Sequence, residues 1–84
     1  MNDKLSDILL NINITFSELF KHNYKITNII YGNPWDDYEY AINVNIYNIA
    51  GISSELTKAF NSISDNYVIY YNHNDFFKIV FEIN

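Results

Sequence analysis

The stretch Tyr38–Tyr47, with the sequence YEYAINVNIY, alternates apolar and polar residues along almost its whole length. Successive side chains of a β-strand point to opposite faces, so Tyr40, Ile42, Val44 and Ile46 would share one face. This alternation predicts a strand with one buried and one more polar face. A sheet built from such strands needs a second layer over its buried face, and the rest of the chain has to supply that layer.

The sequence predicts three further strands. Tyr24–Tyr31 is rich in β-branched and aromatic residues and stops at the turn sequence Gly32-Asn33-Pro34, which predicts a hairpin with Tyr38–Tyr47 and a loop near 33–37. Tyr67–Tyr71 and Phe76–Ile83 are separated by Asn72-His73-Asn74-Asp75, which is also turn chemistry. The chain therefore predicts two hairpins.

Two segments have helical periodicity. The first runs from Asp3 to about His22, and a strand over 10–16 is the alternative interpretation of part of it. The second begins after Gly51, with Ser53 or Ser54 as its N-cap. The apolar stripe of the first helix is expected to comprise Leu5, Ile8, Leu9, Ile12, Phe16, Leu19 and Phe20, and that of the second Ile52, Leu56, Ala59, Phe60 and Ile63.

The element order is thus αββαββ, which predicts an α+β fold with two helices packed on one face of a four-stranded antiparallel sheet. We expect a single domain over residues 1–84, with both hairpin turns at the same end of the sheet. An internal αββ duplication, over about 3–49 and 51–84, remains open. The tripeptide Ser-Glu-Leu at 17–19 and again at 54–56 favours it, although the composition is biased enough to produce such an echo by chance.

Composition narrows the class of protein. The 84 residues carry a formal charge of −5 and contain no Cys, which excludes disulfides and thiolate metal sites. The excess of Asn and Ile is typical of AT-rich codons, but the same bias should enrich Lys, which is scarce. A negative chain is a poor direct ligand for nucleic acid or an anionic membrane and a good one for a basic protein. Lacking a signal-peptide pattern, it is expected in the cytoplasm.

No catalytic set is recognisable. The only histidines, His22 and His73, stand at a helix end and in a turn, without a neighbouring motif. The chain offers no cysteine nucleophile and no serine in a glycine-rich elbow. We therefore expect a non-enzymatic protein with no metal site and no cofactor.

The loop between the first two strands holds the only Pro, the only Trp and the densest group of acids. One interpretation is a turn whose Trp packs over the edge of the core, and the other is a recognition loop, since Trp and Tyr often anchor interfaces. The candidate partner-binding residues are Trp35, Asp36, Asp37, Tyr38 and Glu39, joined by Asp75 from the second hairpin.

The sheet face turned away from the helices is the second candidate surface. Ile29, Tyr31, Tyr47 and Tyr70 are expected to lie on it, which would leave an aromatic, partly apolar face. Such a face would suit a partner or a homodimer.

These observations favour a small acidic inhibitor of a basic, nucleic-acid-handling protein. Proteins of this kind in phages and mobile elements include anti-CRISPR and anti-restriction proteins, which would act in the host cytoplasm. An immunity or antitoxin protein that neutralises a toxin enzyme is an alternative, and it would use the same acidic and aromatic surface. A homodimeric structural or interaction module is another alternative.

Overall fold

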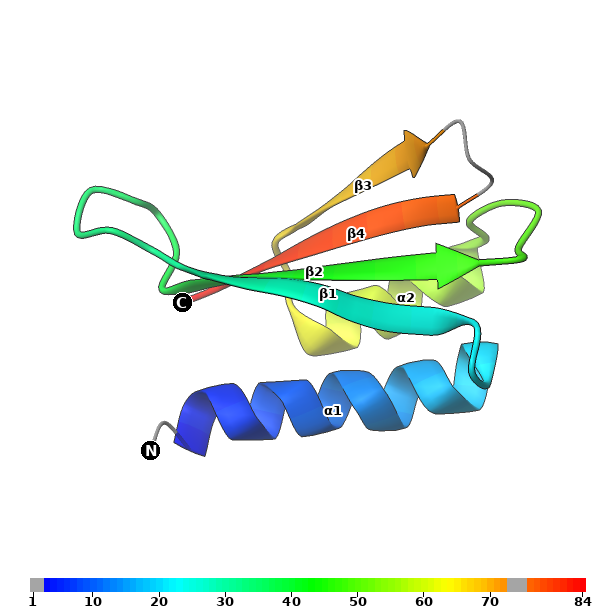
Figure 1. Ribbon diagram of the computed structural model, residues 1–84, viewed down its shortest axis with the longest axis horizontal. Coiled ribbons are helices and arrows are strands. Elements are labelled where there is room, and N and C mark those ends of the chain that lie inside the picture. Colours follow the sequence, from blue (N-terminus) through cyan, green and yellow to red (C-terminus); the bar gives the residue numbers. More distant parts are fainter. Residues whose placement is uncertain (1–2, 73–75) are drawn as a thin grey trace.

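The chain forms two layers, an antiparallel sheet and two helices that cover one of its faces (Figure 1). This is a computed structural model, and it describes residues 3–72 and 76–84. The elements in chain order are α1 (Asp3–Phe20), β1 (Tyr24–Tyr31), β2 (Tyr40–Tyr47), α2 (Ser54–Ile63), β3 (Tyr67–Asn72) and β4 (Phe76–Ile83). The predicted α+β class and its element order are therefore confirmed.

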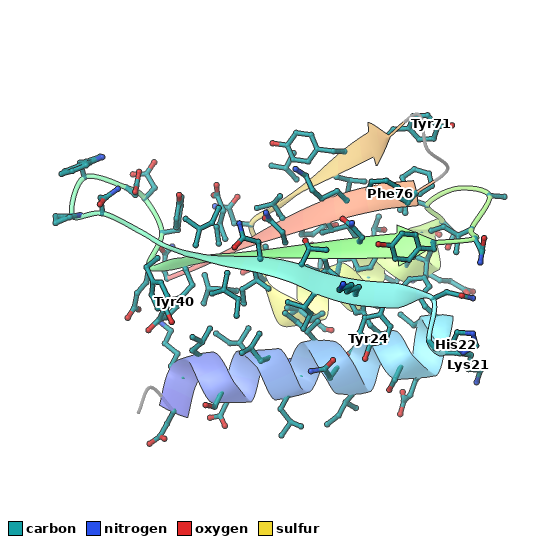
Figure 2. All side chains as sticks on the ribbon, in the orientation of Figure 1. Lys21, His22, Tyr24, Tyr40, Tyr71 and Phe76 are labelled. Carbon is teal, nitrogen blue, oxygen red and sulfur yellow. The ribbon has the colours of Figure 1, made fainter. Side chains whose placement is uncertain are left out.

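The strand order is β1-β2-β4-β3, with every neighbouring pair antiparallel. Tyr31, Tyr40 and Ile83 are paired at one end of the sheet, whereas Tyr47 and Phe76 are paired at the other. The loop between β1 and β2 leaves the sheet at the first of these ends, whereas β3 ends and β4 begins at the second. The expectation that both hairpins turn at the same end is therefore wrong. The reason is that β4 lies antiparallel to β2, which reverses the direction of the second hairpin. Figure 2 shows Tyr71 and Phe76 at the end where α1 joins β1.

The core lies between the helices and the alternating residues of β2 and β4. Ile42, Val44, Ile46, Ile79 and Phe81 are fully buried on the helix side of the sheet. From the helices, Ile12, Phe16 and Phe60 meet them and are also fully buried. Each such side chain removed from water contributes about 1.5–3 kcal/mol, so this shared core is the main source of stability.

The helix ends follow local chemistry. Lys21 adopts a left-handed φ of 59°, which ends α1 at Phe20, slightly before the predicted boundary. At the start of α2 the Ser53 hydroxyl accepts a hydrogen bond from the Leu56 N–H at 3.3 Å, which confirms the predicted cap. Leu19 is exposed and does not belong to the buried stripe, because the core face of α1 runs through Phe16 and Phe20.

An aromatic contact is repeated in the two αββ halves. Phe16 of α1 packs edge-on against Tyr24 at 5.7 Å, and Phe60 of α2 packs against Tyr67 at 5.8 Å. Tyr24 and Tyr67 each open the strand after their helix, and each hydroxyl donates back to that helix, to Asn13 at 2.9 Å and to the Thr57 carbonyl at 3.4 Å.

The two phenylalanines also meet each other, with ring centroids 5.6 Å apart. The Ser-Glu-Leu tripeptides do not correspond in the fold, because 17–19 lie in the last turn of α1 and 54–56 in the first turn of α2. The duplication remains a prediction, and the aromatic contacts are better support for it than the tripeptide.

Candidate protein-binding site

The loop over residues 32–39 joins β1 to β2 and projects beyond the end of the sheet (Figure 1). Two backbone bonds fix its base. The Gly32 N–H donates to the Glu39 carbonyl at 2.8 Å, and the Glu39 N–H donates to the Ile83 carbonyl of β4 at 2.7 Å. The loop therefore leaves the sheet from an anchored position, although it is itself exposed over much of its length.

Its tip is a hydrogen-bonded four-residue turn, 33–36. The Asp36 N–H donates to the Asn33 carbonyl at 2.9 Å, and the Asn33 N–H donates to the Asp36 carboxylate at 2.7 Å. Pro34 occupies the second position, where its fixed φ suits a turn. These two reciprocal bonds and the proline restrict the backbone around Trp35.

Trp35 is 79% exposed at the third position of this turn. The interpretation in which it packs over the edge of the core is excluded by that exposure. A large aromatic ring held in water by a restricted backbone gains nothing for folding, whereas it loses little conformational freedom on entering a pocket. The geometry thus favours the recognition-loop interpretation.

The acids of the loop differ in what they contact. Glu39 forms an ion pair with Lys4 of α1 at 3.0 Å, and the Lys4 ammonium also donates to the Asn84 carbonyl. The Asp36 carboxylate is occupied by the turn. Within residues 3–72 and 76–84, no hydrogen bond or ion pair reaches Asp37, which is exposed. The freest negative charge therefore lies two residues from the tryptophan.

Two tyrosines support the base of the loop. Tyr38 is half-buried, and its carbonyl lies against Gly32, where an added Cβ would come within 2.0 Å of that oxygen. Tyr40 is buried below the loop, where Tyr31 packs edge-on against it at 5.5 Å. Burial, and then the negative charge of Glu39, raise the pKa of Tyr40 above its ordinary value.

Asp75 lies outside the described residues, and its predicted place beside Trp35 has no support from the sheet. The ends of β3 and β4 that flank 73–75 lie at the far end of the sheet from the 32–39 loop. Of the predicted group of four acids, the structure describes Asp36, Asp37 and Glu39, and all three lie in the loop at this end of the sheet.

The second candidate surface is rearranged by a β-bulge. The β1–β2 register shifts between Ile26 and Asn28, so Ile29 pairs with Ile42 and Tyr31 with Tyr40, on the helix side. The prediction that Ile29 and Tyr31 lie on the open face is wrong, because one extra residue reverses the alternation beyond it. Tyr47 and Tyr70 do lie on the open face, where they pair with Phe76 and Lys78.

The open face holds a shallow depression of about 540 Å³. The Lys78 ammonium stands 5.1 Å from the centre of the Tyr70 ring, and among residues 3–72 and 76–84 no carboxylate lines the depression. The amide oxygens of Asn43 and Asn45 are buried beneath this face without a hydrogen-bond partner. The lining residues are Thr27, Asn28, Asn43, Asn45, Tyr70, Tyr71, Phe76 and Lys78.

Across residues 3–72 and 76–84, no group of three or more His, Cys, Asp or Glu side chains is placed to hold a metal ion. The same part of the chain has no helix long and apolar enough to cross a membrane.

Sequence reasoning missed two residues that shape the site. Lys4, which is remote in sequence, neutralises Glu39. Asn33 stabilises the turn through its hydrogen bond to the Asp36 carboxylate. An Asn three residues before an Asp, with Pro34 between them, is a sequence pattern that predicts such a turn.

No protein-family model, curated protein or solved structure matches this chain.

Proposed function

We propose that this protein is a small, non-enzymatic inhibitor that binds a basic, nucleic-acid-handling protein through its 32–39 loop. The observation that carries the proposal is Trp35, exposed at the tip of a hydrogen-bonded turn. In the complex the indole fills an apolar pocket, and Asp37, with Asp36 beside it, meets Lys or Arg side chains at the rim of that pocket.

The restricted turn favours affinity because the loop has little freedom left to lose on binding. The chain's formal charge of −5 favours encounter with a basic surface and disfavours nucleic acid or an anionic membrane as a direct ligand. A protein that handles nucleic acid provides such a basic surface at its own binding site. The inhibitor would then compete with nucleic acid by occupying part of that site.

The small size, the acidic charge and the AT-rich composition together support an anti-defence protein of a phage or mobile element, of the anti-CRISPR or anti-restriction type. Its place of action is then the host cytoplasm. It needs no cofactor, because binding alone blocks the partner.

The test is affinity capture from a host lysate, followed by titration of the purified captured protein. Trp35→Ala should weaken binding by about 30-fold to 1,000-fold, as expected for an interface anchor. Asp37→Asn should cost about tenfold and flatten the salt dependence, because it removes one charge from the rim. Leu10→Ala is the matched control, since Leu10 is exposed and apolar on the outer side of α1, away from the loop.

Two results would overturn the proposal. One is a captured partner that binds Trp35→Ala as tightly as the unchanged protein. The other is binding that is indifferent to salt and leaves the partner's hold on nucleic acid intact. A toxin enzyme as the captured partner would move the assignment to an immunity protein.

A further inference from the structure

The two edges of the sheet differ in how open they are to a further strand. β1 and β3 are the outermost strands. β1 carries Lys25 and the register shift between Ile26 and Asn28, and both charge and bulges protect an edge from pairing. β3, with the sequence YVIYYN, has no charge, no proline and no register shift against β4. Only β1 is protected.

The hydrogen-bond pattern of β3 shows which backbone groups are free. The Glu82 N–H donates to the Asn66 carbonyl at 2.9 Å, and residue 66 lies opposite residue 82 in the β3–β4 register. Because bonding alternates along an antiparallel pair, Val68 and Tyr70 then bond to β4. Tyr67, Ile69 and Tyr71 turn their N–H and C=O groups outward, away from the sheet.

The side chains of this edge are also uncovered. Val68, Tyr70 and Tyr71 are all exposed, and they are large apolar or aromatic residues. A strand of six residues with high β-propensity, no charge and a free edge is a template for another strand.

We propose that β3 pairs with β3 of a second copy of this chain, antiparallel, about a two-fold axis at Ile69. The pairing makes one continuous sheet across the two copies. In this register Tyr67, Ile69 and Tyr71 lie opposite Tyr71, Ile69 and Tyr67 of the second copy. Every outward N–H and C=O of the three residues then meets a partner, as a two-fold interface requires.

The side chains match in the same register. On the open face Val68 lies opposite Tyr70 of the second copy, and an aromatic residue opposite a β-branched one is a favourable cross-strand pair. On the helix face the two tyrosines at 67 and 71 are opposed. The exposed Tyr71 thereby gains a neighbour.

The register singles out a second copy as the occupant, because about the two-fold axis each outward backbone group of β3 and each of its side chains meets a matching group on the same strand. Two copies of a chain with a charge of −5 repel each other, so they associate best where neither presents a carboxylate. The strand 67–72 is such a place, since it carries no acidic or basic side chain. This inference is independent of the 32–39 loop. That loop joins β1 and β2, and β4 separates these two strands from β3.

Analytical ultracentrifugation of the purified chain over micromolar to millimolar concentrations tests the proposal, because small interfaces have affinities in that range. The unchanged protein should rise from its monomer mass of 9.9 kDa towards twice that value. Val68→Lys should stay monomeric. Ile30→Lys is the matched control, because Ile30 is 41% exposed on the protected edge strand and Val68 is 43% exposed on β3.

A charge pair separates a lost interface from a damaged fold. The residues at 68 in the two copies lie diagonally across the axis, within reach of long side chains. An equimolar mixture of Val68→Lys and Val68→Glu should therefore associate, whereas each variant alone stays monomeric. A monomeric unchanged protein at millimolar concentration would overturn the proposal. So would association that survives Val68→Lys, or that Ile30→Lys abolishes equally.

Discussion

The two halves of the molecule, α1-β1-β2 and α2-β3-β4, share a core contact and differ at their surfaces. In each half a helix Phe packs on the Tyr that opens the next strand, and the Tyr hydroxyl donates back to the helix. The connection between the strands differs: residues 32–39 form a projecting loop with an exposed Trp35, whereas only 73–75 separate β3 from β4. The outer edges also differ, because β1 is bulged and β3 is regular.

This difference distinguishes the residues that stabilise the fold from the exposed residues that a partner could contact. The features common to both halves lie in or against the core, where Phe16 and Phe60 are buried and pack on each other, so they contribute to stability. The features found in one half alone are exposed, and folding does not explain them. Both proposed interaction sites, the 32–39 loop and the β3 edge, fall in this second group.

The largest expected effect tests whether the shared contact is equivalent in the two halves. Phe16→Ala and Phe60→Ala should each lower the free energy of unfolding by about 3–5 kcal/mol, because both rings are fully buried and each leaves a cavity. Urea unfolding followed by circular dichroism measures both. If one substitution cost much less than the other, the two halves would not be equivalent in the core.

The two glycines provide the next test. An added Cβ at Gly32 would meet the Tyr38 carbonyl, whereas one at Gly51 would meet nothing within 4 Å. Gly32→Ala should therefore cost about 1–3 kcal/mol through a forced shift at the base of the loop. Gly51→Ala should be neutral or slightly stabilising, since it only restricts the unfolded chain. Thermal unfolding compares them, and equal effects would contradict the close packing at Gly32.

The smallest effect concerns the two adjacent acids of the loop. Asp36→Ala should cost about 1 kcal/mol, because it removes the acceptor of the Asn33 N–H. Asp37→Ala should change stability by less than about 0.5 kcal/mol, since its carboxylate is exposed. Chemical denaturation distinguishes the two, and the reverse order would show that Asp36 does not hold the turn.

The sequence predicted correctly those features that depend on one strand or one helix alone. The alternation in Tyr38–Tyr47 and the helical stripes predicted the elements and the layering, because burial of one face imposes its period on the residues. Strand order was not readable, since the same alternation is satisfied whether or not β2 and β4 are neighbours. The places of Ile29 and Tyr31 were missed because one bulge residue reverses every side chain after it.

The sequence predicted which loop residues belong to the candidate site, but it did not predict the contacts that position them. The grouping of Trp35, Asp36 and Asp37 is visible in the sequence. The ion pair from Lys4 to Glu39 depends on how α1 crosses beneath the sheet, which no local pattern encodes.

The most direct measurement uses the fact that Trp35 is the only tryptophan, so fluorescence excited at long wavelengths, where the eight tyrosines do not absorb, reports on the tip of the loop alone. Acrylamide is the suitable quencher, because it is neutral and the neighbouring acids do not repel it. The account predicts water-like emission that is freely quenched in the isolated protein. When the captured partner is bound, and the emission of its complex with Trp35→Phe is subtracted, the Trp35 emission should be blue-shifted and protected from quenching. An indole already shielded in the free protein, or one that stays equally quenchable in the complex, would contradict the claim that this loop is the binding element.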